Sequence, residues 1–286
     1  NKHTLFTMND PEQLPKYAPK YNSILNKIAT LKGTAFVYTE YKTLEGIAVL
    51  KIVLKANGYA EFKIGKNEKD ELVQVVDNED IDKPKFAFWG GNEESDILRK
   101  VFNNEVDEIP LSLRTDLESR GKNNLRGDVI KILLTTKTGA EGIDLHNVRQ
   151  VHIVEPYWNP VRTEQVKGRA VRVGSHIKLP SKDRTVEIYT YLSVISPEHL
   201  KEDKTIEIDS HGLTSDQVLF DISSKKLQVM THLLKLIKEV SVDCSINIAE
   251  TKDETDDFKC LSYGTTDNRD NYSYIPTINR DQQDTE

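Results

Sequence analysis

The sequence contains 286 residues, of which 37% are apolar and 30% are charged, and its formal net charge is −7. It has no run of about 18 apolar residues, so no membrane-spanning helix is expected. Its polar beginning lacks a signal-peptide core and an initiator methionine, so we expect a fragment without a leader. Two cysteines, Cys244 and Cys260, are too few for a disulfide scaffold or a four-cysteine zinc site, and we expect free or buried thiols in a reducing, intracellular compartment.

The negative charge is concentrated near the C-terminal end of the sequence. Residues 250–286 contain 10 acidic and 4 basic side chains, a net charge of −6, whereas residues 120–189 contain 13 basic and 7 acidic side chains, a net charge of +6. Because the local charge decides which surface can meet phosphate groups, the overall value does not exclude a protein that binds nucleic acid.

Hydrophobic periodicity predicts helices that alternate with strands. After a polar segment at residues 1–19, helical spacing of apolar residues indicates helices at residues 21–31, 44–56, 93–102, 159–173 and 217–240. Short apolar runs between turn residues indicate strands at residues 34–39, 86–89, 129–135, 148–154 and 185–193. The charged residues 61–82 suggest an inserted loop or edge hairpin, and residues 104–128 are expected to be irregular. This alternation is typical of an α/β domain with a mostly parallel sheet.

Small polar residues follow the strongest predicted strand. Thr135, Thr136, Gly139, Gly142 and Asp144 lie in the segment TTKTGAEGID directly after it. In an open α/β sheet, ligands bind at the carboxyl ends of the strands, and hydroxyl groups and free backbone N–H groups suit phosphate oxygens. An ordinary strand-to-helix turn uses the same residue types, so this segment alone leaves both interpretations open.

A polar stripe follows on the predicted helix at residues 159–173. Gln165, Arg169 and Arg172 are spaced at i, i+4 and i+7, which places them on one face, and Gly168 beside them would permit close approach. Two arginines on a rigid helix can clamp a transferring γ-phosphoryl group. The alternative is a solvated face whose arginines pair with glutamates.

Other conspicuous residues indicate structure rather than chemistry. Tyr157 and Trp158 are expected to pack and fix the loop before the helix, and the pair Gly90–Gly91 is expected to form a turn. No two histidines have metal-ligand spacing on a predicted helix, so no metal site is predicted.

The order of these motifs resembles the C-terminal RecA-like lobe of superfamily 2 helicases. Residues 136–145 resemble motif V, and residues 165–172 resemble motif VI. The Trp-Asn-Pro connection and Gly174 resemble the chromatin-remodeller-like branch. The segments EPYWNPVRTEQVKGRAVRVGSHIKLP and RTVEIYTYL are most similar to helicases and ATPases of large DNA viruses, which are relatives of poxvirus early transcription factors and nucleoside triphosphatases.

The resemblance implies a fold and a division of the chain. The fold would be α/β, a RecA-like and mostly parallel sheet flanked by helices, with a C-terminal helical extension. The divisions would be a linker from an N-terminal lobe at residues 1–19, the RecA-like domain at 20–196, the helical extension at 197–249 and an acidic tail at 250–286.

The resemblance also implies roles for individual residues. Arg169 and Arg172 would be arginine fingers, and Gln165 would help to sense the γ-phosphate. Gly142 and Asp144 would line the nucleotide cleft, with Asp144 near the ribose and near Arg172. The residues expected to face the nucleic-acid backbone are Tyr38, Thr39, Thr135, Thr136 and Gly139, with Lys137 as a weaker candidate.

The chain has neither a G-x-x-x-x-G-K-[ST] loop nor an Asp-Glu box. In the family these belong to the N-terminal lobe, which holds ATP with Mg²⁺. The resemblance therefore implies half of an ATP-dependent helicase or translocase, inactive alone and acting in viral transcription. Its expected partners are the N-terminal lobe, nucleic acid (DNA rather than RNA) and RNA polymerase or transcription factors, without a membrane. The expected location is the virion or the host cytoplasm or nucleus.

A non-catalytic RecA-like interaction module of a transcription complex is the alternative function. The missing ATP-binding loop favours it, because such a module would need no ATP. The stripe of Gln165, Arg169 and Arg172 argues against it, because a module without ATP has no use for these residues.

Overall fold

The computed structural model describes residues 6–7, 10, 13–43, 46–90, 93–119, 123–137, 142–202, 212–241, 244 and 260. The chain forms two compact units, Asn1–Asp221 and Ile222–Glu286. The predictions for Gly139 and, apart from Cys260, for the acidic tail lie outside the described residues. Among the described residues, no helix is both long enough and apolar enough to cross a bilayer.

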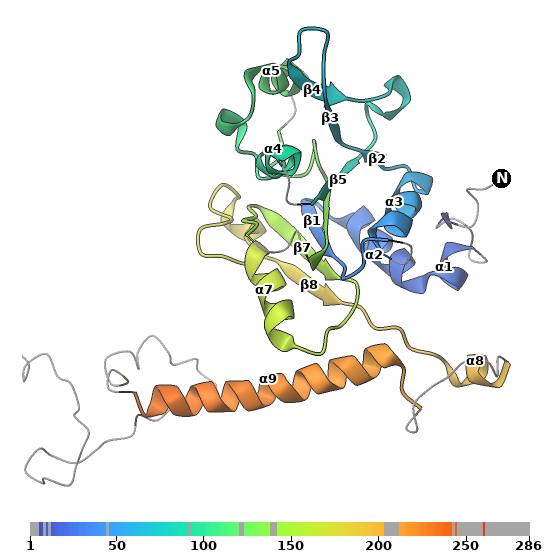
Figure 1. The fold of residues 1–286 in the computed structure, drawn as a ribbon, viewed down its shortest axis with the longest axis vertical. Coiled ribbons are helices and arrows are strands. Elements are labelled where there is room, and N and C mark those ends of the chain that lie inside the picture. Colours follow the sequence, from blue (N-terminus) through green and yellow to red (C-terminus); the bar gives the residue numbers. More distant parts are fainter. Residues whose placement is uncertain are drawn as a thin grey trace, which may run out of the picture. The chain divides into compact units, whose positions relative to one another are not determined.

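The first unit is built on a six-stranded sheet with the order β2-β5-β6-β1-β7-β8 (Figure 1). All neighbouring strands of this sheet are parallel. The strands are β1 (Thr34–Tyr38), β2 (Ala60–Glu61), β5 (Lys85–Trp89), β6 (Ile132–Thr135), β7 (Val148–Ile153) and β8 (Glu187–Thr190). The predicted α/β fold with a parallel sheet is thereby confirmed. All six strands end at the same side of the sheet, which we call the carboxyl edge.

Helices cover both faces of the sheet. The helices are α1 (Leu14–Tyr17), α2 (Pro19–Thr30), α3 (Ile47–Ala56), α4 (Glu93–Phe102), α5 (Leu111–Ser119), α7 (Pro160–Ala170), α8 (Pro197–Glu202) and α9 (Ser215–Glu239). Side chains of α1, α2 and α3 pack on one face with Ala35 and Val37, whereas side chains of α4, α5 and α7 pack on the other with Phe36. Because successive strand residues point to opposite faces, β1 and β6 are buried on both sides and read as continuous apolar runs.

The predicted elements agree with the structure for most of the first unit, and the differences have local causes. The charged insertion contains an antiparallel hairpin of β3 (Lys63–Lys66) and β4 (Leu72–Val75), as expected for an edge hairpin. The prediction that residues 104–128 are irregular is wrong, because α5 forms there and buries Leu113 and Leu117 one turn apart. Apart from Leu111, which is 77% exposed, only these two apolar residues mark the helix among polar ones.

Two further predictions are corrected by the structure. Helix α7 begins with the predicted Asn159 cap, whose Oδ1 accepts from the Val161 N–H at 3.1 Å, but it ends at Ala170 instead of near residue 173. Val171 leaves the helix with φ −109° and ψ 82°. Cys244 and Cys260 are not free thiols but form a disulfide, with their Cα atoms 5.7 Å apart. Cysteine count and spacing do not reveal how close two Cα atoms lie in the fold.

Candidate active site

Residues 142–147 form an irregular segment between α4 and α7. Gly142 begins this segment with a φ of 80°, a left-handed conformation that glycine adopts without a steric penalty. The backbone N–H of Leu145 donates to the carbonyl oxygen of Arg169 at 3.2 Å. This bond holds the predicted cleft-lining segment along the C-terminal end of α7.

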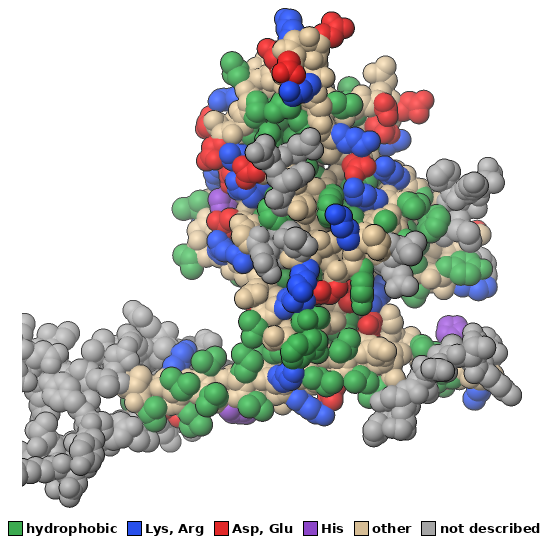
Figure 2. Space-filling view, in the orientation of Figure 1, with side chains coloured by type: hydrophobic (Ala, Val, Ile, Leu, Met, Phe, Trp, Pro, Cys, Tyr) green, Lys and Arg blue, Asp and Glu red, His purple; other side chains and the backbone are tan. Residues whose placement is uncertain are grey.

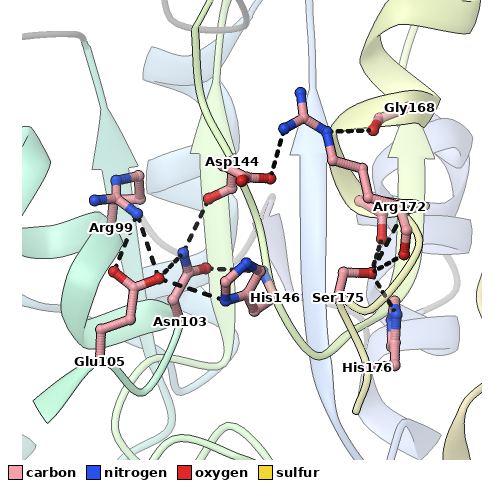
Figure 3. Close-up of polar contacts among 10 residues, drawn as sticks. Arg99, Asn103, Glu105, Asp144, His146, Gly168, Arg172, Ser175 and His176 are labelled. Carbon is pink, nitrogen blue, oxygen red and sulfur yellow. Dashed lines mark hydrogen bonds and ion pairs between the residues drawn. The ribbon is translucent and has the colours of Figure 1, made fainter. Parts of the chain in front are cut away.

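The side chain of Asn103, directly after α4, holds the other side of the segment (Figure 3). Its Nδ2 donates to the Asp144 carbonyl and its Oδ1 accepts from the His146 N–H, both at 2.9 Å. Nδ2 also donates to Glu105 Oε1 at 2.8 Å, and Glu105 pairs with Arg99 at 3.1 Å. Because Asn103 is fully buried, these bonds form a fixed clamp on the backbone of the segment.

The carboxylate of Asp144 points toward Arg172 (Figure 3). Arg172 Nη1 lies 3.0 Å from Asp144 Oδ1, and the two side chains are 42% and 47% exposed. Arg172 Nε donates to the Gly168 carbonyl at 3.3 Å. The proximity expected from the sequence is present, and both side chains are partly exposed although Asp144 Oδ1 itself is buried.

Gln165 and Arg169 lie one turn apart on α7, as predicted. Gln165 is exposed and Arg169 is half-buried. The Nε atom of Arg169 is buried and has no hydrogen-bond partner among the residues that the structure describes. Arg172 lies beyond the end of α7, so the prediction of a three-residue stripe on one helix is wrong for Arg172.

Ser175 and His176 hold the loop that carries Arg172. Ser175 Oγ donates to the Arg172 carbonyl at 2.8 Å and lies 2.7 Å from His176 Nδ1. His176 Nε2 lies 2.6 Å from the Val148 carbonyl, and because a carbonyl only accepts, this nitrogen carries the proton. These contacts replace the missing helical turn in fixing the position of Arg172.

This arrangement suits one side of a triphosphate. It provides two guanidinium groups, a glycine backbone and a carboxylate that can accept from a ribose hydroxyl or hold an arginine. A Cβ atom at Gly142 or Gly168 would meet no atom within 4 Å, so neither glycine is required by the described packing and both leave room for a ligand. Within the described part of the chain, no cluster of three metal-ligating side chains occurs.

The residues predicted to face nucleic acid lie at the carboxyl edge, but their side chains are buried. Tyr38, Thr39, Thr135 and Thr136 are at most 5% exposed. Thr39 Oγ1 donates to Glu155 Oε1 at 2.9 Å, and Thr135 Oγ1 donates to the Trp89 carbonyl at 3.1 Å. The hydroxyl groups of Thr39 and Thr135 therefore bond inside the protein and do not reach solvent. The neighbouring Lys42 and the weaker candidate Lys137 are exposed.

A charged cluster connects the carboxyl edge to α7. Arg162 Nη1 lies 3.1 Å from both carboxylate oxygens of Glu40, and Tyr38 Oη donates to Glu40 Oε1 at 2.6 Å. The Arg162 guanidinium also lies 4.0 Å from the centre of the Tyr157 ring. The packing prediction thus agrees with Tyr157, whereas Trp158 is 46% exposed.

Two pKa shifts reflect the burial of this region. Burial and the hydrogen bond to Glu40 raise the pKa of Tyr38 well above its usual range, so its phenol stays a donor. Burial raises the pKa of Glu155, and the bonds from Thr39 and the Glu40 backbone N–H oppose that shift.

Sequence reasoning missed the residues that position the site. Asn103, Glu105 and Arg162 act through contacts with residues far away in the chain, such as Asp144, which lies 41 positions after Asn103. Ser175 acts locally, on a loop whose course the sequence does not reveal. One signal was the position of Asn103 directly after the predicted helix at residues 93–102, which does not identify its partners.

Known proteins that are similar to this chain belong to the family that the order of its motifs resembles. Residues 89–174 match the helicase conserved C-terminal domain. The chain is 32% identical over 262 residues to the "Termination factor NPH-I homolog" of African swine fever virus, covering 82% of this chain and 35% of that protein. It is 31% identical over 229 residues to the "Putative ATP-dependent RNA helicase R350" of Acanthamoeba polyphaga mimivirus, covering 80% of this chain and 24% of that protein.

The chain thus spans about a third or less of the length of these viral relatives. Among solved structures, the C-terminal part of the Fun30 ATPase domain is 18% identical, with a TM-score of 0.37, and the match covers 79% of this chain and 62% of that one.

Proposed function

We propose that this chain, which carries a helicase C-terminal domain of the large DNA virus type, is the second motor lobe of an ATP-dependent nucleic-acid helicase or translocase. In this proposal the N-terminal lobe binds ATP with Mg²⁺, and the present lobe supplies Arg169, Arg172 and Gln165 to the γ-phosphate. Gly142 and Asp144 line the cleft between the lobes. The predicted divisions at residues 1–19, 20–196, 197–249 and 250–286 belong to the same proposal.

The observation that carries the proposal is the environment of the two arginines. Arg169 has a buried Nε atom without a hydrogen-bond partner among the described residues, and leaving such a donor unpaired is costly. Arg172 is held by Asp144 in a half-exposed pair. Because Arg169 Nε is buried, the Arg169 side chain would turn to bring its guanidinium group to an incoming γ-phosphate, which would also draw Arg172 from Asp144.

The chemistry assigned to this chain is electrostatic. When the lobes close on ATP, the guanidinium groups stabilise the negative charge that develops on the transferring phosphoryl oxygens. Hydrolysis removes that attraction, so the lobes separate again. The chain alone lacks the ATP-binding loop, and we therefore expect it to have no ATPase activity.

Nucleic acid would bind along the carboxyl edge. Tyr38, Thr39, Thr135 and Thr136 would form the floor of this surface, and the exposed Lys42 and Lys137 would contact phosphates. Gly139 is kept as a predicted contact with the nucleic-acid backbone. Contacts with the backbone imply little sequence preference and strong dependence on salt. Relatives described as a termination factor and as RNA helicases support a role in viral transcription. The choice of DNA rather than RNA, and of RNA polymerase or transcription factors as partners, is part of this proposal.

The test is the substitution Arg169→Ala in this lobe joined to its ATP-binding lobe. Loss of an arginine finger should reduce nucleic-acid-stimulated ATP hydrolysis by about 10³-fold or more. The matched control is Lys167→Ala on the same helix, because Lys167 pairs only with the exposed Glu164, at 2.7 Å, among the contacts described. It should leave the rate within about twofold. ATP hydrolysis by Arg169→Ala close to the wild-type rate would show that Arg169 is not a finger.

A second candidate, the non-catalytic interaction module, is favoured by one observation. Leu233, Leu236 and Ile237 on α9 are each more than half exposed, and apolar side chains gather along this helix (Figure 2). If α9 serves only a partner, a chain that ends before α9 should retain ATPase stimulation in the joined protein but lose partner binding. A module without ATPase function would show no stimulated hydrolysis in either form.

A further inference from the structure

A pocket with a volume of about 680 Å³ lies at the carboxyl edge, where β7 and β8 end. Its lining includes Tyr17, Tyr21, Tyr41 and Tyr191, together with Glu155 and Asp216. The volume is in the range of pockets that hold small ligands. Neither the arginines nor the segment at residues 142–147 takes part in it, so it is separate from the nucleotide site.

Tyrosine rings in this pocket are accessible for stacking. Tyr17 is 67% exposed and Tyr41 is 53% exposed. The backbone of Tyr41 is held on both sides, because its N–H donates to Thr39 Oγ1 at 3.2 Å and its carbonyl accepts from the Ile47 N–H at 3.1 Å. A Cβ atom at Gly46 would clash with that carbonyl, so glycine is needed for this turn. Tyr41 is therefore presented from a fixed backbone.

Two polar groups of the pocket, the Tyr191 hydroxyl and the Glu155 carboxyl group, can accept hydrogen bonds. His152 Nε2 lies 3.2 Å from Gln150 Oε1, while Gln150 Nε2 donates to Glu187 at 2.9 Å. Because Gln150 Oε1 only accepts, His152 Nε2 carries the proton, and Nδ1 accepts from the Tyr191 hydroxyl at 2.8 Å. The Tyr191 oxygen then has lone pairs left to accept, and the Glu155 carboxyl group adds further acceptors.

The charges disfavour a phosphate inside the pocket. Its cation, Lys20, is paired with Asp216 at 2.6 Å, and Asp216 also accepts from the Ser193 N–H. Glu155 has no cation within ion-pair distance among the described contacts. By contrast, Lys42 follows Tyr41 and is exposed outside this pocket, where it can meet a phosphate next to a stacked base.

We propose that this pocket receives one unstacked nucleobase of the bound strand, with a ring stacked on Tyr41 and an exocyclic amino group donating to Glu155 and Tyr191. This assignment rests on the proposed nucleic-acid interface. It predicts a preference for a base that carries an amino group, such as cytosine, over thymine.

The experiment measures binding of this chain to three single-stranded DNAs of equal length, about 12 nucleotides: oligodeoxycytidylate, oligothymidylate and an abasic strand. Fluorescence anisotropy at low salt should show the cytosine strand bound about 5-fold or more tightly than the abasic strand, with thymine between them. Tyr41→Ala should lower the cytosine affinity to the abasic value without changing abasic binding, and Tyr41→Phe should retain most of the affinity. Lys42→Ala should weaken all three strands equally, because it removes a phosphate contact.

The outcomes distinguish failure of the base-pocket proposal from failure of the proposed nucleic-acid interface on which it rests. Equal binding of the cytosine and abasic strands would overturn the base pocket and leave the backbone interface standing. A Tyr41→Ala variant that weakens abasic binding as much as cytosine binding would also overturn it. Equal affinity for cytosine and thymine would overturn the role of the acceptors, and failure to bind any strand would overturn the interface together with the pocket. Circular dichroism of each variant checks that the fold is retained.

Discussion

At the scale of single residues, the surroundings determine what each side chain can do. Arg169 and Arg172 are the same residue type three positions apart, yet one has an unpaired buried nitrogen and the other an acidic partner. The sequence predicted both residues because their spacing is distinctive. It could not predict the difference, which depends on where α7 ends and on Asp144, 28 positions before Arg172.

His152 offers a test of the buried core by its dependence on pH. The side chain is fully buried, and burial, with Lys27 nearby, lowers its pKa to about 3. The histidine pKa in the unfolded chain is about 6.5, so between about pH 6.5 and 3 the unfolded chain binds a proton at His152 and the folded chain does not. We expect the free energy of unfolding to decrease as the pH falls from about 6.5 toward 3, by up to about 1.4 kcal/mol per pH unit.

The measurement is urea unfolding of the wild type and of His152→Gln across this pH range. The raised pKa of Glu155 stabilises the folded state as the pH falls, which is opposite in sign to the effect of His152. Because this contribution is the same in both proteins, the difference between their unfolding free energies isolates the effect of His152. His199→Gln, at an exposed position, is the control and should not change the slope. An unchanged slope for His152→Gln would contradict a neutral, buried His152.

At the scale of elements, the sequence predicted those with strong periodicity. The predictions for β1, β5, β6 and β7 agree with the structure because their apolar runs match burial on both faces of the sheet. The edge strand β8 and the helix at residues 93–102 were also predicted, although β8 is largely exposed. Elements with few apolar residues were missed: β2 has two residues, and α5 has two buried anchors. The end of α7 depends on a hydroxyl and an imidazole in the following loop, which no local pattern reveals.

The clamp between α4 and residues 142–147 can be tested by Asn103→Ala. The substitution removes bonds to the Asp144 carbonyl and the His146 N–H, leaving backbone groups unpaired inside the protein. We expect a loss of about 2–4 kcal/mol in the free energy of unfolding, measured with urea. Asn123→Ala, which removes one exposed bond to the Leu125 N–H, should cost less than about 1 kcal/mol. Equal small losses for both variants would mean that Asn103 does not clamp the segment.

At the scale of the whole molecule, the parallel sheet explains why two kinds of site occur in one unit. The strands bring their carboxyl ends to one edge, where the nucleic-acid interface is proposed. Helix α7 begins there with Arg162 bound to Glu40 and ends at the proposed nucleotide site with Arg169. These arginines are about 10 Å apart along the helix axis, so a rigid α7 can transmit a shift at one site to the other. The sequence predicted both sites but not the Arg162–Glu40 contact.

The most direct test of the central proposal is ATP hydrolysis by this chain, by the ATP-binding lobe, and by the two joined in one protein, each with single-stranded DNA. The account predicts negligible turnover by either part and a rate at least about 10³-fold higher for the joined protein, because only the joined protein places Arg169 at the phosphate. Hydrolysis by this chain alone, or a joined protein no faster than the ATP-binding lobe, would contradict the assignment of a second motor lobe.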